Sequence, residues 1–318
     1  MEFWTPFGHA GKQPLASESF STAMFTEYSG KPPGLRQTQS IVSRSRNCAL
    51  IVALLALLSR PVAGAEDNQT GFRVIKERDG DTITLIMKSD YACEFTVTFE
   101  ASLKNMTPSQ PLPLTVDAAG RTSFVLVRLR RTDRRLAWRY YNLHYYWQLG
   151  GRRASTNNDA DYAMPFKPGR YVVMQGPRGS YSHFAGSGSE NAVDWTCPVG
   201  TVVCAAREGR VVGVRQDSTV GGPDRKFRPF ANYVIIKHAD GTFADYVHLK
   251  TGGALVKMGD EVTVGQPIGL SGQTGFTSAP HLHFSVFQAI DGKKKLTLPF
   301  RLKTDHGTFT EFIRGRAY

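Results

Sequence analysis

The chain has 318 residues, of which 41% are hydrophobic and 21% are charged, and its formal net charge at pH 7 is +12. These are ordinary globular values that leave room for one large domain or two modest ones, and they exclude a disordered tail and a polytopic membrane protein. The basic excess favours an anionic polymer as partner: nucleic acid, an acidic membrane surface or an anionic cell-wall polymer.

The first element in chain order is an apolar run from Cys48 to Leu58. It is too short for the roughly 20 residues of a membrane-spanning helix, but it suits the core of a secretory signal. Two arginines precede it, and the small residues of positions 62–65 follow it, before two acidic residues. We therefore expect residues 1–65 to be a leader cleaved after Ala65, which predicts a periplasmic or secreted protein; the alternative is an uncleaved anchor. Export argues against nucleic acid as the partner.

Short strands are expected next, because β-branched and aromatic residues alternate with polar ones and no helical period is present. This pattern predicts a β-sandwich-like domain over residues 66–150. Its role is open, and it could bind a protein of the cell envelope. The expected strands span residues 82–86, 95–100, 124–128 and 138–147.

A polar stretch then predicts a linker over residues 151–164. Strand patterns return after it, without a convincing 3.6-residue period. We expect a second domain over residues 165–290 and a C-terminal extension over residues 291–318, so the whole mature chain is predicted to be all-β. The expected strands span residues 171–174, 202–206, 209–214, 233–237, 242–248, 261–264 and 281–287.

Three cysteines follow the expected leader, at positions 93, 197 and 204. An odd number cannot form a complete disulfide framework. Cys197 and Cys204 could form a disulfide across a turn, and the alternative is two buried thiols. The chain has no CxxC motif, so a zinc ribbon is not supported.

Histidines gather in the second domain and suggest a metal site. His281 and His283 face the same side of an expected strand, and His248 ends another. Asp194 lies between Val193 and Trp195, where a buried carboxylate needs a strong partner such as a cation. The alternative for the HxH pair is a solvated sheet face. For His238, at the end of a strand, we expect a surface position.

With these residues the sequence resembles the lysostaphin-type, or LytM-like, zinc metallopeptidases, which cut peptide bonds in peptidoglycan. The resemblance covers about residues 165–290. The matching segments, in order, span residues 191–195, 198–201, 208–212, 232–238, 246–249, 256–260, 265–269, 271–275 and 280–284.

The resemblance implies an antiparallel β-sheet fold with a duplicated hybrid motif and one Zn²⁺ per chain. It implies that His183, Asp194 and His283 bind the zinc and leave one position open, as in catalytic sites, while His248 and His281 form a catalytic pair that does not bind metal. The spacing departs from the family's commonest pattern, which has a histidine four residues before the aspartate. Here that position is Glu190, so we expect His183 to act across a longer spacer, with Glu190 as the alternative ligand.

The expected function is therefore that of an exported zinc endopeptidase acting on stem peptides or cross-links of peptidoglycan. Two other classes stay open. The first is a non-catalytic relative that binds peptidoglycan or activates an amidase. The second is a lipoyl or biotinyl carrier module with Lys257 as its modified lysine, a hypothesis that leaves the histidines unexplained.

Overall fold

The computed structural model describes residues 72–90, 93–118, 120, 122–153 and 160–318. The expected leader, residues 1–65, lies outside these ranges. The described residues form strands and one short 3-10 helix, η1 (Arg225–Phe230), so the all-β prediction is confirmed. None of their helices is long and apolar enough to cross a membrane.

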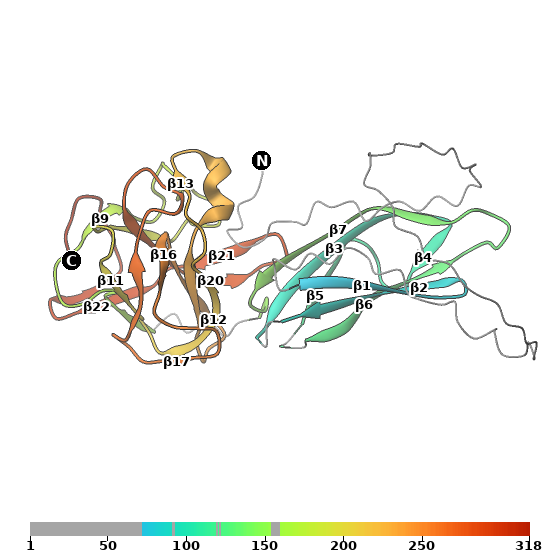
Figure 1. Ribbon diagram of the computed structural model, residues 1–318, viewed down its shortest axis with the longest axis horizontal. Helices are drawn as coiled ribbons and strands as arrows, with labels where there is room; N and C mark the ends of the chain where they lie inside the picture. Colours follow the sequence, from blue (N-terminus) through green and yellow to red (C-terminus); the bar gives the residue numbers. More distant parts are fainter. Residues whose placement is uncertain (1–71, 91–92, 119, 121, 154–159) are drawn as a thin grey trace, which may run out of the picture.

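The strands before residue 150 form two antiparallel sheets, with the orders β1-β2-β6-β4 and β5-β3-β7 (Figure 1). Strand β2 alternates between partly and fully buried residues because successive side chains point to opposite faces. Leu85 from one sheet and Phe95 from the other belong to one apolar core, the arrangement of a β-sandwich. The strands are β1 (Phe72–Asp79), β2 (Thr82–Ser89), β3 (Phe95–Lys104), β4 (Met106–Pro108), β5 (Leu114–Asp117), β6 (Ser123–Arg131) and β7 (Arg139–Leu149).

The strands after residue 160 are organised around an eight-stranded antiparallel sheet. Its order is β17-β12-β14-β15-β20-β10-β9, with β21 beside β20. The bounds are β9 (Val172–Gln175), β10 (Val193–Thr196), β12 (Gly209–Arg215), β14 (Tyr233–Lys237), β15 (Phe243–Val247), β17 (Glu261–Val262), β20 (His281–Ala289) and β21 (Lys295–Leu298).

Three small sheets complete this part of the chain. The first joins β11 (Val202–Cys204), β18 (Pro267–Ser271) and β16 (Leu249–Ala254). The second joins β13 (Gly221–Gly222) and β19 (Gly275–Phe276), and the third joins β23 (Gly307–Phe309), β22 (Arg301–Thr304) and β8 (Asp161–Ala163).

The core of the second part extends beyond residues 165–290. Tyr162 and the late residues Phe300, Leu302 and Tyr318 are all buried in it. Strand β22 pairs in parallel with β8, which ties the C-terminal segment to the start of this part. Segments expected as linker and extension therefore contribute to one core, and the domain boundaries themselves stay a prediction.

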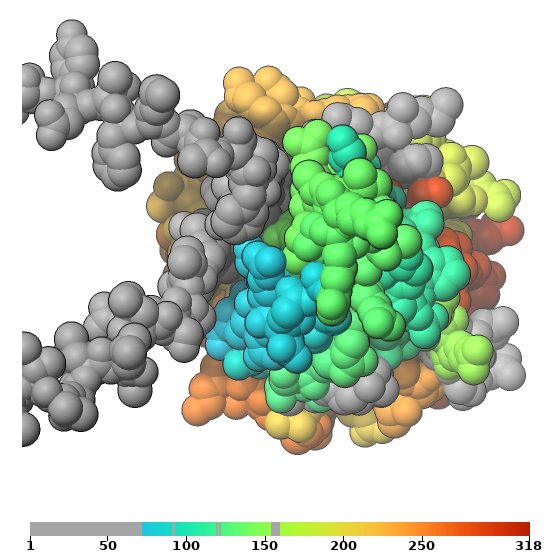
Figure 2. Space-filling model, turned by 90° about the vertical axis from the view of Figure 1, so that its right-hand side faces the viewer, coloured from blue at the N-terminus to red at the C-terminus, as the bar shows by residue number. Residues whose placement is uncertain are grey.

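The two faces of the large sheet pack into different hydrophobic cores. On β20, Leu282, Phe284 and Val286 face the core of the second part. Phe287, on the opposite face, joins Phe243 of β15 and the core of the sandwich. The sandwich thus lies against one end of this sheet face, in front of the second part when the molecule is viewed along its long axis (Figure 2).

The loop between β20 and β21 strengthens this contact. The amide N–H of Gly292 donates to Thr98 Oγ1 at 2.9 Å. A Cβ atom at Gly292 would lie 2.2 Å from the carbonyl oxygen of Tyr146. The close approach of the two backbones therefore requires glycine at this position.

The structure contradicts two expectations about single residues. Cys197 and Cys204 are buried free thiols, so the disulfide alternative is wrong. His238 is fully buried, so the expected surface position is wrong as well. Its Nδ1 lies 2.7 Å from the carbonyl oxygen of Glu208, and burial lowers the pKa of its ring to about 4, which keeps it neutral inside the protein.

A buried ion pair lies on the sheet face between the sandwich contact and the histidines. Asp245 of β15 contacts Lys295 Nζ of β21 at 2.5 Å, and both side chains are fully buried. The hydroxyl of Ser285 donates to the other carboxylate oxygen. Burial lowers the pKa of Lys295, and the charge of Asp245 opposes this effect. Each buried charge is therefore stabilised by the opposite charge of its partner.

We predict that Lys295→Met lowers the free energy of unfolding by about 3–5 kcal/mol, because it leaves the Asp245 carboxylate buried without its counter-charge. The double variant Asp245→Asn/Lys295→Met removes both charges and is expected to regain at least half of that loss. Urea unfolding in the presence of a chelator measures both. Lys293→Met, which breaks a part-exposed ion pair with Glu100, is the control and changes stability by about 1 kcal/mol or less. Equal losses in the single and double Lys295 variants would contradict the account.

Candidate metal centre

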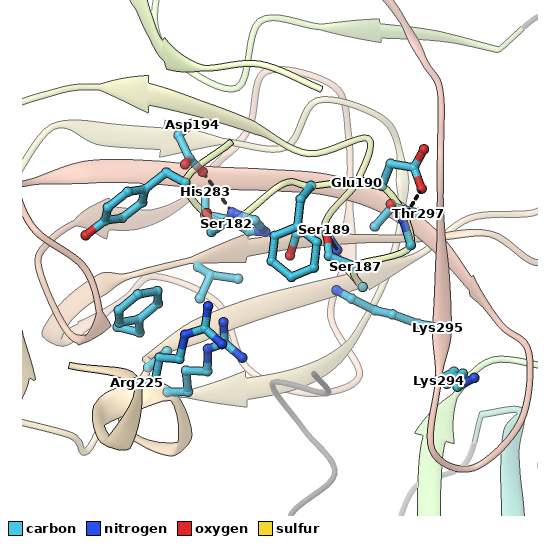
Figure 3. A pocket seen from close by; sticks show the side chains of 18 of the residues that line it. Ser182, Ser187, Ser189, Glu190, Asp194, Arg225, His283, Lys294, Lys295 and Thr297 are labelled. Atoms are coloured by element: carbon cyan, nitrogen blue, oxygen red, sulfur yellow. Dashed lines mark hydrogen bonds and ion pairs between the residues drawn. The ribbon is translucent and has the colours of Figure 1, made fainter. Parts of the chain in front are cut away.

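Asp194 and His283 are brought together by the register of two neighbouring strands. Asp194 of β10 is the pairing partner of His283 of β20. Val193 and Trp195 on β10 face the apolar core, so the alternation of the strand turns Asp194 to the other face. There its Oδ1 lies 2.8 Å from His283 Nδ1 (Figure 3).

His183 reaches the same carboxylate from the connection between β9 and β10. Its ring is fully buried, and its Nε2 lies 3.3 Å from Asp194 Oδ1. Its Nδ1 lies 3.1 Å from the carbonyl oxygen of Gly176. If Nδ1 carries the proton and donates a hydrogen bond to this carbonyl, Nε2 is unprotonated and directs its lone pair at the carboxylate. This buried Nε2 makes no hydrogen bond.

The three side chains form a group with the size and chemistry of a metal site. Their candidate ligand atoms all lie within 4.8 Å of one another, and all three residues are buried. Two imidazole nitrogens and one carboxylate oxygen are a ligand set that zinc accepts. The buried and unsatisfied Nε2 of His183 is what such an ion would satisfy.

His281 and His248 lie beside this group without joining it. His281 Nε2 is 3.8 Å from Asp194 Oδ1, and His281 Nδ1 lies 2.8 Å from the carbonyl oxygen of Ala279. His248 Nδ1 lies 2.7 Å from the carbonyl oxygen of Thr274. The two rings are 4.5 Å apart between centroids. Each ring thus has one nitrogen held by a backbone carbonyl and the other directed elsewhere.

His248 occupies a strained backbone conformation. It connects β15 to β16 with a φ of 69°, in the left-handed region that residues other than glycine rarely adopt. Such strain persists only where surrounding contacts enforce it, and it concentrates at functional positions.

The buried charges shift the pKa values of these groups in opposite directions. Burial opposes the charged form of Asp194, but His183 and His281 outweigh it and hold the pKa of the carboxyl well below its usual range. Burial also disfavours a charged His183, but Asp194 outweighs it and raises the pKa of that ring. Burial and the neighbouring histidines lower the pKa of His248, and burial lowers that of His281 although Asp194 opposes it.

Gln175 is a site residue that the sequence analysis did not single out. It lies on β9, opposite Asp194, and its amide donates to Asp194 Oδ2 at 3.0 Å. The side-chain oxygen Oε1 of Gln175 accepts hydrogen bonds from the backbone N–H groups of Tyr181 and Ser182. Gln175 therefore connects the carboxylate to the loop that carries His183. A glutamine at the end of a strand carries no pattern that predicts this role.

Glu190, the alternative ligand, is engaged elsewhere. Arg178 contacts its carboxylate at 3.0 Å, and the amide N–H of Gly186 donates to it at 2.8 Å. The contact with Gly186 closes the segment between His183 and Asp194 into a loop, and the contact with Arg178 joins this loop to the chain before His183. Glu190 is not part of the three-residue group.

A cavity of about 480 Å³ opens over the site. Its lining includes Asp194, His248, His281 and His283 at one end and residues 294–297 of the β21 region at another. Residues 181–182 and 184–190 and two residues of η1 also line it. The arrangement can hold a ligand against the histidine group.

Comparison with known proteins places this part of the chain in a family. Residues 188–295 match the model of Peptidase family M23. Residues 188–295 form an M23 domain of the LytM type. The matched range includes Asp194, His248 and the two histidines of β20, while His183 lies just before it.

Several curated relatives match parts of this chain. An uncharacterized metalloprotease of Buchnera aphidicola is 34% identical over 112 residues, which are 35% of this chain and 26% of the relative. The peptidoglycan DD-endopeptidase ShyA of Vibrio cholerae is 38% identical over 130 residues, covering 40% and 27%. The glycyl-glycine endopeptidase ALE-1 of Staphylococcus capitis is 33% identical over 132 residues, covering 41% and 32%. The chain thus spans about a quarter to a third of the length of these relatives.

We predict that Zn²⁺ binding releases protons and weakens as the pH falls. Asp194 raises the pKa of His183, so below that pKa a proton occupies the Nε2 that faces the carboxylate, and a metal ion must displace it. Calorimetric titration of metal-free protein with Zn²⁺, in two buffers of different ionisation enthalpy between pH 5.5 and 8, measures both effects. Affinity that is independent of pH, with no proton released, would contradict this assignment.

Proposed function

We propose that this chain is a zinc metalloendopeptidase that hydrolyses peptide bonds in peptidoglycan. The observation that carries the proposal is the buried convergence of His183, Asp194 and His283 beneath an open cavity. The M23 match supports it, as do relatives that are named peptidoglycan endopeptidases.

The proposed zinc ligands are His183 through Nε2, His283 through Nδ1 and one oxygen of Asp194. Zinc in a site with three protein ligands supplies a Lewis acid that polarises a carbonyl group and lowers the pKa of water. The hydrogen bond of Gln175 to the second carboxylate oxygen would orient Asp194 towards the metal.

His248 and His281 are the proposed catalytic pair. Each donates a hydrogen bond from Nδ1–H to a backbone carbonyl, so each presents Nε2 as a hydrogen-bond acceptor when neutral. One such nitrogen can accept the proton of the attacking water, and the resulting imidazolium can donate it to the leaving amine. Its charged form can also stabilise the oxyanion that forms at the carbonyl.

Location and partners follow from the substrate. We propose an extracytoplasmic protein, in agreement with the expected leader and with the net charge of +9 that residues 66–318 carry, which suits an anionic wall polymer. The sandwich would bind a protein of the cell envelope. The non-catalytic alternative is not favoured, because four of the five expected site residues line one cavity and the fifth, His183, contacts Asp194 of that lining.

We predict that the purified chain holds about one zinc ion and that His183→Ala abolishes binding, because a nitrogen ligand is lost. Glu190→Gln is the matched control and should retain zinc, since Glu190 is engaged by Arg178. Elemental analysis after dialysis measures the zinc content. Loss of zinc in the Glu190 variant with retention in the His183 variant would reverse the ligand assignment.

We predict that His248→Ala and His281→Ala retain zinc but lose turnover by about 10²–10⁴-fold, the usual contribution of a general acid or base. Release of new amino groups from purified peptidoglycan measures turnover, and the wild-type signal should vanish with a chelator and return with added Zn²⁺. Stoichiometric metal loss in either variant would contradict its role. Zinc-loaded wild type without any release of amines would contradict the proposed function.

A further inference from the structure

The helix η1 supplies two arginines to the wall of the cavity. Arg225 and Arg228 are both among its lining residues. Figure 3 shows Arg225 extending from η1 towards the cavity, across from Asp194 and His283. The two guanidinium groups are close enough for the charge of Arg225 to disfavour the charged form of Arg228, whose pKa is lowered first by burial and then by this repulsion.

Contacts on the side of His248 hold the second arginine in place. The guanidinium of Arg228 lies 5.2 Å from the ring centroid of Phe276. Phe276 is two residues after Thr274, whose carbonyl accepts the hydrogen bond of His248. A group bound by these arginines would therefore lie beside the histidine group, within the same cavity.

In the part of the chain that the structure describes, Lys226 of η1 and the acidic side chains of the cavity lining have ion-pair or hydrogen-bond partners, in contrast to Arg225. Lys226 contacts Asp224 at 3.2 Å, and it does not line the cavity. Among the described residues, no carboxylate lies within ion-pair distance of Arg225. The acidic lining residues have partners of their own: Glu190 is held by Arg178, and Asp194 faces the histidines.

We propose that Arg225 and Arg228 bind a free carboxylate of the peptide substrate and thereby select acidic peptides over neutral ones. A carboxylate removes the repulsion between two guanidinium groups and accepts charge-assisted, bidentate hydrogen bonds from them. The exposed rings of Tyr181 and Phe184 on the adjoining wall would contact the apolar parts of the same peptide. This inference rests on the proposed peptidase function, and it names the chemical class of its substrate.

The test compares two forms of one substrate. Cross-linked peptides released from peptidoglycan are used as prepared and after amidation of their carboxyl groups with carbodiimide and ammonia. Full-length wild type, Arg225→Gln and the control Lys226→Gln are assayed on both, for kcat/KM with zinc and for binding to metal-free protein by fluorescence anisotropy. The binding readout does not depend on hydrolysis, so it separates this inference from the proposed function.

We expect wild type to prefer the acidic form by about 10-fold to 100-fold, the range expected for one or two hydrogen bonds to a charged group. Arg225→Gln should lose most of this preference and leave the amidated peptide unaffected, while Lys226→Gln behaves as wild type on both. Equal binding of the two forms by wild type would overturn the inference. So would a loss in Arg225→Gln that is the same for both peptides. Discrimination in binding without any hydrolysis would instead overturn the proposed function alone.

Discussion

The carboxylate of Asp194 is the group on which the whole centre depends. It is buried on a strand whose neighbouring side chains face an apolar core, where an isolated charge is strongly disfavoured. Three histidines and the amide of Gln175 surround it. Because strand register sets Asp194 opposite His283, the sheet itself fixes the position of one charge and one imidazole. His183 reaches this pair from the loop between β9 and β10.

The same sheet face continues from this centre to the sandwich. Along β20, His281 and His283 face the cavity, Ser285 contacts the buried pair of Asp245 and Lys295, and Phe287 enters the core of the sandwich. The β20–β21 loop is held by the backbone approach at Gly292, and residues of β21 line the cavity. The sandwich therefore supports one wall of the site directly. That connection gives the N-terminal part of the chain a structural role apart from any partner it binds.

Local pattern was sufficient to predict much of the fold and of the histidine group. The alternation of apolar and polar residues along segments such as β2 and β20 predicted these strands, because side-chain direction repeats every two residues. The recurrence of such segments predicted the all-β class of the chain. The alternation also predicted that His281 and His283 share a face and that the buried Asp194 needs a partner. The family resemblance, now confirmed by the M23 match, supplied the grouping of these residues with His183 and His248.

Features that depend on distant contacts could not be predicted in this way. Gln175 meets Asp194 only through the pairing of β9 with β10, and no local signal marks it. His238 was expected at the surface because its strand ends there, but a backbone carbonyl and the ring of Tyr162 enclose it. The late residues Phe300 and Tyr318 also enter the core through distant contacts. Phe300 directly precedes β22, which pairs with β8, and the backbone of Tyr318 exchanges hydrogen bonds with that of Tyr171.

The most direct test of the central claim is anomalous diffraction at the zinc absorption edge from crystals of the zinc-loaded chain. We expect one peak per chain at about 2.0–2.2 Å from His183 Nε2, His283 Nδ1 and an oxygen of Asp194. His248 and His281 should lie outside bonding distance of the peak. A peak that is ligated by Glu190, or one located away from this cavity, would contradict this claim.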